Sequence, residues 1–533
     1  MRAVLAQPAL WIALLAFVAY LPTAGRVLKL GPDAVEYLDI GRRLAAGEGY
    51  LLGVKAFHVG GTDVLHDGLA ERAPLFPFTI AALFRLGFGP IAVQVLNALL
   101  TACSVALVVA LGSRLFGSRI GAMSGILAAA SPLVLERMIW PMTEALTIVL
   151  SLLAIWLVVR FGAGARPVPL GLAGLTLGLA YLARPTAAVL IGVLACGVWL
   201  LAPDRRRHGI GLASLLAGTA IFALPITVYS LLRRGSLSYL GQTYLYSVYK
   251  DPEVMEYGFT GPLPTAAEFV GANLGRVVVA VGDMVVAYGR LLFLEWELLL
   301  FLLPAWPLVL VALARRRYSR EALLVLLVAA ANFFIYALTW STFQDRYLLL
   351  TLLLLLPFAL DGLARIGLDR IHLPGPLPLS PLGVLVLIVA AAWGQFFVRE
   401  YRGEFRYGEL PSPVRRDEGL RWTAPPRWMR DGDVPRLANW LNTRTAREAV
   451  VAHAQPWPFA FFTGRPAVLV PLTLDETRLR DFISTYQVAV FLFDPRDQDR
   501  RRYQEWLDAM EGEGVEVFTL GAYRIYTTGA LWR

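Results

Sequence analysis

Charged residues, lysine and cysteine are all scarce in this sequence. Only 17% of the 533 residues are charged, and the mean hydropathy is +0.58. Soluble proteins carry about 25% charged residues, so this composition excludes an ordinary soluble protein and indicates an integral membrane protein. The two cysteines, Cys103 and Cys196, both fall within apolar runs, so no disulfide framework is indicated.

Lysine occurs only three times, against 46 arginines, and the formal net charge is +9. The basic residues lie mostly in short stretches between apolar segments, and they form no basic and aromatic surface motif. The positive charge therefore gives no reason to expect a nucleic-acid partner.

Long apolar runs dominate the first 400 residues. A membrane-spanning helix needs about 20 apolar residues. The first run is long and many others follow it, so we expect a retained anchor and not a cleaved signal peptide. We predict eleven spans, at about 9–28, 90–112, 119–136, 142–160, 168–183, 186–202, 209–232, 289–313, 321–340, 346–363 and 378–398.

The arginines between these spans predict their direction, because cytoplasmic loops are enriched in basic residues. With the N-terminus inside, the short outer connections hold one arginine each, at positions 137, 184 and 346. The segment 73–89 would invert every later loop if it were a span, so we expect an interfacial or re-entrant helix on the outer side. The predicted cytoplasmic loops hold Arg114, Arg119, Arg160, Arg166, Arg205, Arg206, Arg207, Arg315, Arg316, Arg317, Arg320, Arg365 and Arg370.

Two domains are expected. Residues 1–398 form a transmembrane module with outer loops at about 30–89 and 233–288, and residues 399–533 form a soluble α/β domain on the same outer side. The tail alternates helical and strand patterns. Helices are expected near 434–444, 456–462, 474–485 and 499–510, and strands near 449–454, 466–471, 488–494, 515–520 and 523–528.

Ionisable residues gather at the predicted outer ends of the spans. If Pro32 takes the first position of a helix, Asp33, Glu36 and Tyr37 share one face. Ionisable groups in such places are often functional, although snorkelling and structural ion pairs are the alternatives. The candidates are Asp33, Glu36, Tyr37, Arg72, Arg137, Glu144, Arg184, Arg346 and Tyr347.

Carboxylates facing arginines suit group transfer from a lipid phosphate. A carboxylate can take the proton of an acceptor hydroxyl while fixed cations stabilise the departing phosphate. Arginine fits this role because its planar fork binds two phosphate oxygens and stays charged.

Several motifs resemble the GT-C membrane glycosyltransferases, in particular the branch of protein O-mannosyltransferases and the lipid A aminoarabinose transferase. The resemblance covers most of residues 10–400 and rests on the order and spacing of the motifs. They read "PDAVEYLDIGRRLAAGEGY", "ERAPLFPF", "PMTEALTIVLSLLAIW", "LARPTAAVL" and "DRYLLLTLLLLLP".

The resemblance implies roles for the matching residues. Asp33 takes the place of the family's catalytic base, with Tyr37 four residues on. The family often has a second acid directly after the base, where this chain has Ala34. Either Glu36 substitutes for it or the second acid is dispensable. The remaining matches are Arg72 at the lipid phosphate, the pair Arg346 and Tyr347 that opens a late span, Glu144 in donor or acceptor positioning and, more weakly, Arg184.

The resemblance also implies a substrate class and a location. The donor is a polyprenyl-phosphate sugar, the acceptor a hydroxyl of a lipid, glycan or protein, and the anomeric centre is inverted. The enzyme is expected in the inner or plasma membrane of a bacterial or archaeal cell, working at the periplasmic or extracellular side of the cell envelope. The alternatives are a transporter or flippase for a lipid-linked or anionic solute, which would favour repeats and mid-membrane charges, and an assembly scaffold.

Three other segments give weaker signals. No cofactor is firmly expected, although His58, Asp63 and His66 could hold a divalent metal ion; an ordinary polar loop is the alternative. The tyrosine-rich stretch 239–258 suits a membrane-interface belt or an acceptor groove. The stretch 453–466 is expected in the core of the tail domain, with acceptor contact as the alternative.

Overall fold

The computed structural model divides the chain into two compact units. The membrane unit comprises residues 1–29, 88–239 and 279–422, and the second unit residues 30–87, 240–278 and 423–533. The structure describes residues 8–22, 24, 32–55, 62–164, 166–201, 205–234, 266–294, 318–339, 344–365, 380–402, 433–471, 475–493, 501–511, 515–521 and 523–528.

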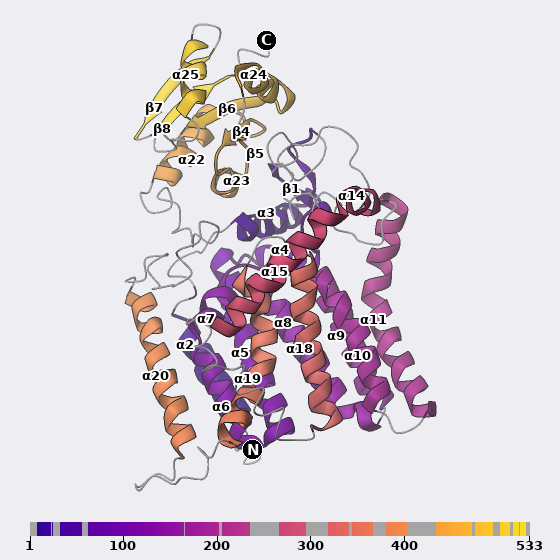
Figure 1. Ribbon diagram of the computed structural model, residues 1–533. Helices are drawn as coiled ribbons and strands as arrows, with labels where there is room; N and C mark the ends of the chain where they lie inside the picture. The colour runs from indigo at the N-terminus through magenta and orange to yellow at the C-terminus, as the bar shows by residue number, and fades with distance from the viewer. Residues whose placement is uncertain are drawn as a thin grey trace. The chain divides into compact units, whose positions relative to one another are not determined.

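The membrane unit is built from helices (Figure 1). Three short 3₁₀ segments, η2 (Gly162–Gly164), η3 (Pro185–Ala187) and η4 (Asp345–Leu348), lie beside the ends of longer helices. The helices are α2 (Pro8–Tyr20), α5 (Pro90–Phe116), α6 (Ser118–Ala130), α7 (Pro132–Ile139), α8 (Glu144–Phe161), α9 (Pro167–Ala183), α10 (Ala188–Leu201), α11 (Arg205–Arg234), α18 (Arg320–Thr339), α19 (Leu349–Leu363) and α20 (Pro381–Arg402).

Apolar helices coincide with ten of the eleven predicted spans. Within the described residues, five stretches are long and apolar enough to cross a membrane: α5, α8, α11, α18 and η4 with α19. The helices α6 and α7 would make a sixth, but they meet at an angle of 58° at Ser131–Pro132, so the predicted span 119–136 is a broken one. The predicted span 289–313 lies largely outside the described residues.

The predicted outer loop 233–288 differs from the structure. Helices α14 (Ala266–Ala272) and α15 (Leu274–Leu294) occupy its second half. In α15 the valines recur at helical spacing between glycines and Asp283, a pattern that a search for continuous apolar runs does not register. The tyrosine-rich stretch 239–258 lies outside the described residues.

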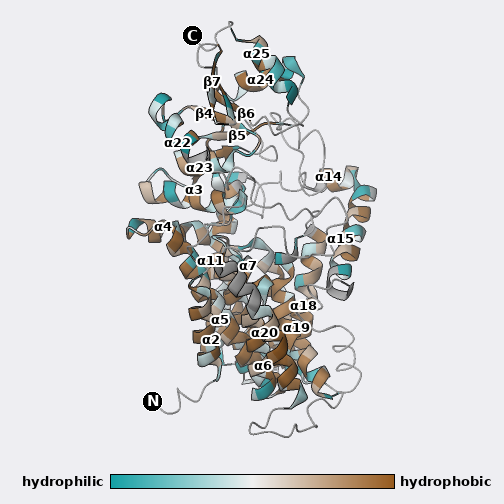
Figure 2. Ribbon diagram, turned by 90° about the vertical axis from the view of Figure 1, so that its left-hand side faces the viewer, coloured by the Kyte–Doolittle hydropathy of each residue, from teal (hydrophilic) through white to brown (hydrophobic). Residues whose placement is uncertain are grey.

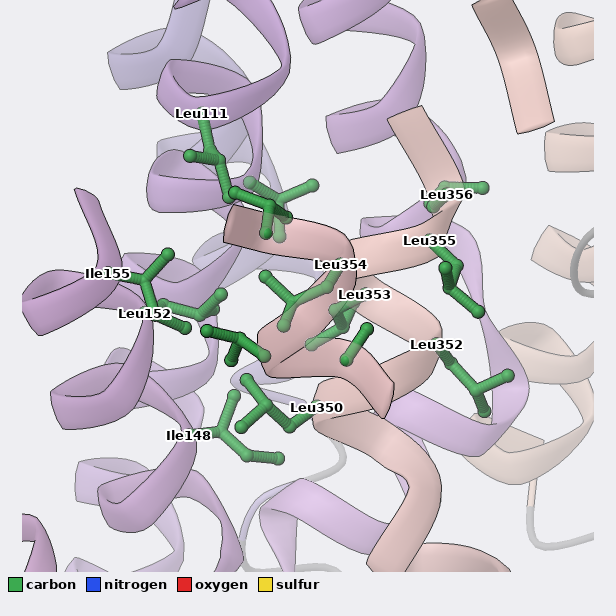
Figure 3. Packing of buried hydrophobic residues seen from close by; sticks show 14 of the residues in the cluster. Leu111, Ile148, Leu152, Ile155, Leu350, Leu352, Leu353, Leu354, Leu355 and Leu356 are labelled. Atoms are coloured by element: carbon green, nitrogen blue, oxygen red, sulfur yellow. The ribbon is translucent and has the colours of Figure 1, made fainter. Parts of the chain in front are cut away.

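The core of the membrane unit surrounds α19, all of whose residues are buried. Its leucines pack against Leu111 of α5 and against Ile148, Leu152 and Ile155 of α8 (Figure 3). Glycines let other helices approach closely. A Cβ atom on Gly174 of α9 would lie 2.0 Å from the backbone oxygen of Leu215 in α11, so only glycine fits there.

Contacts between helix ends agree with the predicted order of the loops. Arg114 at the end of α5 pairs with Glu321 at the start of α18, at 2.7 Å. Arg320, next to Glu321, donates to the backbone oxygen of Leu200 near the end of α10, at 3.2 Å. These are ends that the arginine pattern places together on one side of the membrane.

The second unit contains a six-stranded sheet in the order β2-β5-β4-β6-β8-β7. The strands β2 (Val54–Lys55), β5 (Ala467–Leu469), β4 (Val450–His453) and β6 (Val488–Phe493) run parallel, whereas β8 (Tyr523–Thr527) is antiparallel to β6 and β7 (Glu516–Leu520). A separate two-stranded sheet joins β1 (Leu51–Leu52) to β3 (His66–Asp67). Every strand predicted in the tail is confirmed.

Helices cover both faces of the large sheet. Residues of α22 (Asp433–Arg444), α23 (Trp457–Thr463) and α3 (Pro32–Ala46) share one buried cluster with it, and residues of α24 (Glu476–Thr485) and α25 (Arg501–Ala509) share another. The four tail helices were all predicted. Figure 2 shows hydrophilic residues on α22, α24 and α25, in contrast to the hydrophobic α5, α6 and α19.

The division of the chain differs from the expected one at the first outer loop. Strand β2 pairs with β5 of the tail, so residues 30–87 belong to the same unit as residues 423–533. Buried Asp39 of α3 holds this junction, because it accepts hydrogen bonds from the backbone N–H of Gly53 at 2.8 Å and from Arg43 at 3.0 Å. Arg42 adds a bond to the backbone oxygen of Phe461 at 3.0 Å. Residues 71–87, with η1 (Gly68–Ala70) before them and α4 (Leu75–Arg85) within them, complete the unit.

Candidate active site

Arg72 binds the two carboxylates predicted at the start of α3. Its Nη2 donates to Oδ1 of Asp33 at 2.6 Å, and its Nε donates to Oε2 of Glu36 at 2.5 Å. Asp33 and Glu36 lie three residues apart, so one helical turn presents both to the same guanidinium. We call Asp33, Glu36, Tyr37, Arg72 and Trp457 the Arg72 cluster.

The two carboxylates differ in accessibility. The side chain of Asp33 is 29% exposed and that of Glu36 only 3%. Glu36 also accepts a hydrogen bond from Nε1 of Trp457 at 2.7 Å. Burial raises the pKa of Glu36 above its ordinary value, against the opposing effects of Arg72 and of the Trp457 hydrogen bond.

Aromatic side chains fix the position of Arg72. Its guanidinium lies 5.4 Å from the ring centre of Tyr37, which packs edge-on against Phe76 at 5.3 Å. The hydroxyl of Tyr50 donates to the backbone oxygens of Arg72 and Ala73, at 3.1 and 3.2 Å. The predicted face with Asp33, Glu36 and Tyr37 is thus present in the structure, with Arg72 at its centre.

The membrane unit contains a second cluster of the predicted residues. Glu144, the first residue of α8, is 1% exposed. Its Oε1 accepts from Nη2 of Arg184 at 3.0 Å and lies 3.5 Å from Nη1 of Arg346. With Tyr336 and Tyr347 these residues form what we call the Glu144 cluster.

Two stacked tyrosines support the arginines of this cluster. The rings of Tyr336 and Tyr347 are 4.7 Å apart and nearly parallel, at 6°. The guanidinium of Arg184 lies 4.9 Å from the ring centre of Tyr347, and that of Arg346 lies 5.1 Å from it. Such cation–π contacts hold an arginine without neutralising its charge.

Buried amides and hydroxyls position the backbone around the cluster. Asn97 of α5 donates to the backbone oxygens of Trp140 and Met142, just before Glu144. Thr143 donates to the oxygen of Ala183, next to Arg184, at 3.0 Å. Asn332 of α18 donates to the oxygen of Tyr347 at 3.3 Å. Each bond fixes the main chain directly beside a candidate residue.

The Glu144 cluster lines a pocket. Leucine and isoleucine side chains form its apolar part, and Thr147, Ser151 and Asn332 add polar groups. Thus Glu144, Arg184, Arg346 and Tyr347, which are distant in sequence, contribute to one pocket. The Arg72 cluster and the Glu144 cluster belong to different units, and each is described by itself.

Other predicted residues lie elsewhere. The guanidinium of Arg137 stacks on Trp140 at 5.6 Å, and Arg137 is not among the residues that line the pocket. His58 lies outside the described residues, Asp63 is exposed, and His66 contacts the oxygen of Val64 at 3.0 Å. In the described part of the chain, no group of three or more His, Cys, Asp or Glu side chains comes together.

Comparison with known proteins identifies the fold. The family model for dolichyl-phosphate-mannose-protein mannosyltransferase matches residues 71–231, less than half of the chain. ArnT from Cupriavidus metallidurans, solved with bound undecaprenyl phosphate, is 14% identical with a TM-score of 0.57, and the match covers 97% of each chain. The chain therefore has the GT-C fold. Among curated proteins, none matches the sequence.

Two other GT-C structures resemble the chain. The archaeal oligosaccharyltransferase AglB from Archaeoglobus fulgidus, solved with an inhibitory peptide and a dolichol-phosphate, is 12% identical with a TM-score of 0.54, and the match covers 98% of this chain and 74% of AglB. The arabinofuranosyltransferase AftD from Mycobacteria is 16% identical with a TM-score of 0.54, and the match covers 98% of this chain and 40% of AftD. These matches confirm the fold expected from the motifs.

The sequence analysis missed several residues of the two clusters. Asn97 and Asn332 are amides within apolar spans, and such a buried amide needs partners, which is a usable signal. The stretch 453–466 was expected in the tail core, and this is confirmed, because Trp457 packs against the buried cluster that includes Phe459 and Ala460. The hydrogen bond from Trp457 to Glu36 was not expected. No local pattern joins Trp457 to α3, because 421 residues separate the two partners.

Proposed function

We propose that the chain is an inverting glycosyltransferase of a bacterial or archaeal plasma membrane. It transfers a sugar from a polyprenyl-phosphate donor to a hydroxyl of a lipid, glycan or protein on the outer face of the membrane. The mannosyltransferase family model over residues 71–231 supports this activity. The lipid phosphates bound in the solved ArnT and AglB structures support the donor class.

The accessible carboxylate of Asp33 carries the proposal. It lies one turn before the buried Glu36 and shares Arg72 with it. A general base must reach the proton that it takes, and Asp33 is the exposed member of the pair. Asp33 also follows Pro32 in the first turn of α3, where the helix dipole favours its ionised form.

The reaction needs no covalent enzyme intermediate. Asp33 takes the acceptor's hydroxyl proton as the acceptor oxygen attacks the anomeric carbon. The bond from that carbon to the phosphate oxygen breaks, and polyprenyl phosphate leaves with the electron pair. Attack opposite the leaving group inverts the anomeric centre, so one base suffices and the paired carboxylates of retaining glycosidases are not required.

Glu36 serves a different purpose from the second catalytic acid expected from the sequence. Its carboxylate is buried and already accepts bonds from Arg72 and Trp457. We assign Glu36 as a positioning residue. Its carboxylate fixes the guanidinium of Arg72, and this guanidinium in turn holds Asp33. In the membrane unit, Arg184 and Arg346 carry the fixed positive charge that suits a donor phosphate.

Replacing Asp33 with Asn tests the proposal. The full chain in nanodiscs is given polyprenyl phosphates that carry a neutral hexose, a pentose or an amino sugar. The acceptor probes are a serine- and threonine-containing peptide, an oligosaccharide and a glycolipid. We expect sugar transfer to at least one probe and a loss of about 100-fold or more in the D33N variant, the usual contribution of a general base.

The control for Asp33→Asn is another carboxylate of the same unit. Glu476→Gln removes an exposed carboxylate that pairs with Arg480 at 3.1 Å in the same unit, and it should transfer sugar at the wild-type rate. Undiminished transfer by D33N would remove Asp33 as the base. Movement of the lipid-linked sugar across liposomes, without transfer to any probe, would favour a transporter or flippase.

A further inference from the structure

Within the described residues, one oxygen of the buried Glu144 carboxylate has no hydrogen-bond partner. Both arginines approach Oε1, whereas Oε2 has no hydrogen-bond partner among the described residues. The hydroxyl of Ser151, two turns further along α8, is also buried and unpartnered in the described part of the chain. Glu144 and Ser151 both line the pocket.

Unpaired buried polar atoms are costly and rare in folded proteins. Two of them on one helix, lining the same pocket, indicate that a ligand supplies the missing bonds. Oε2 of a carboxylate can only accept, so the ligand must bring a donor to it. Ser151 can either donate or accept, which suits a second polar group of the same ligand.

The charge around the pocket restricts that donor. Among the described lining residues, the charged side chains are Arg184, Arg346 and Glu144, which leave one net positive charge. An anionic phosphodiester fits this balance. An ammonium group at Glu144 would be repelled by the two guanidinium groups that already share this carboxylate. A neutral hydroxyl would not be repelled.

We propose that this pocket holds the headgroup of the donor and selects a neutral sugar over a cationic amino sugar. Arg184 and Arg346 bind the phosphodiester, and one sugar hydroxyl donates to Oε2 of Glu144. Ser151 bonds a second hydroxyl of the same ring. This inference rests on the proposed function and narrows its substrate class.

Binding of three lipids with equal phosphodiester charge to the full chain in nanodiscs tests the inference. The probes are polyprenyl methyl phosphate, a polyprenyl-phosphate neutral hexose and the corresponding amino hexose. For the wild type we expect the hexose to bind about tenfold more tightly than the methyl diester, because it adds a hydrogen bond to a charged acceptor. The amino hexose should bind no more tightly than the methyl diester.

The Glu144→Gln variant separates recognition from damage. A neutral acceptor makes a weaker bond, so the preference for hexose over the methyl diester should fall at least about fivefold. The methyl diester itself should bind as tightly as before or more tightly, since a negative charge has been removed. General misfolding would weaken both ligands together. Glu321→Gln, which breaks the pair with Arg114 outside the pocket, should leave both affinities unchanged.

Three outcomes would overturn the inference and leave the proposed function standing, and the first two are these. One is a hexose preference that survives in E144Q, and the other is an amino hexose that binds more tightly than the neutral one. The third is equal affinity of the wild type for the methyl diester and the hexose. In that case Glu144 does not recognise the sugar, although the chain still binds polyprenyl phosphodiesters. If no polyprenyl phosphodiester binds at all, the proposed function itself fails.

Discussion

Replacing Trp457 with phenylalanine removes one hydrogen bond and keeps an aromatic ring in place. The bond runs from Nε1 of Trp457 to Oε1 of Glu36, at 2.7 Å. Glu36 is 3% exposed, so water cannot replace the lost donor easily. The other oxygen of Glu36 holds Nε of Arg72, whose Nη2 holds Asp33. The change therefore reaches the proposed base through two ion pairs.

The size of the effect follows from the charge of the acceptor. A hydrogen bond to a charged group contributes about 1.5–3 kcal/mol, which corresponds to roughly 10–100-fold in rate if the whole of it is lost in the transition state. Because Trp457 acts through Glu36, we expect the lower end, about a tenfold loss of kcat. The lost bond had lowered the pKa of Glu36, so this pKa should rise and move the acidic limb of the pH–rate profile upward.

The assay measures release of polyprenyl phosphate from the best donor of the panel between pH 5 and pH 9. KM for the donor should change little, because Trp457 is not among the residues that line the pocket. Trp440→Phe is the matched control, since Trp440 packs against Phe518 at 5.3 Å in the same unit. A wild-type rate and pH profile in W457F would refute the positioning role of Glu36.

The remaining predictions concern the phosphate and a buried lysine. Arg346→Ala should weaken polyprenyl phosphate binding about tenfold, and Arg72→Ala less, because two carboxylates already neutralise Arg72. In the second unit, burial lowers the pKa of Lys55 to about 8, against Glu71 and Asp63, which favour its charged form. Between this value and the unfolded pKa of about 10.4, wild-type stability should rise with pH by about 3 kcal/mol in total, and Lys55→Met should lack the rise.

The sign of the lysine effect follows from proton binding. Below about pH 8 the folded and the unfolded chain both hold the proton, and the folded chain bears the cost of a buried charge. Above that pH only the unfolded chain still binds it, so deprotonation favours folding. Thermal unfolding at pH 7 and 10 measures the difference, and parallel slopes for wild type and K55M would contradict it. For the arginine variants, Arg480→Ala on α24 is the control. Unchanged affinity for polyprenyl phosphate in both Arg346→Ala and Arg72→Ala would show that these arginines do not bind the phosphate.

The helices of the membrane unit were predictable because a bilayer demands long apolar runs, and the leucine-rich stretch 348–356 is such a run. The tail was predictable for a similar reason, because period-two apolar stretches alternate with amphipathic ones. Two features were not predicted. The break at Ser131–Pro132 interrupts an apolar run, and the helix α15 is apolar on only one face. Proline after a helix-capping serine was the available sign of the break.

Sequence identified the charged residues of both clusters but not their partners. Charge at a span end is rare enough to be noticed in a single sequence, as at Glu144 or Arg346. The pairing of β2 with β5 cannot be recognised in a single sequence, because a strand of two residues shows no periodicity. That pairing is what brings Trp457 of the tail into the same unit as Glu36, and only the folded chain reveals it.

The two clusters have opposite charge balances, and this favours a division of tasks. In the Arg72 cluster one guanidinium faces two carboxylates, leaving a net negative charge that suits removal of a proton. In the Glu144 cluster one carboxylate faces two guanidinium groups, leaving a net positive charge that suits a phosphate. The proposed sugar transfer needs a proton acceptor and a phosphate site, and the charge balance of each cluster suits one of these two tasks.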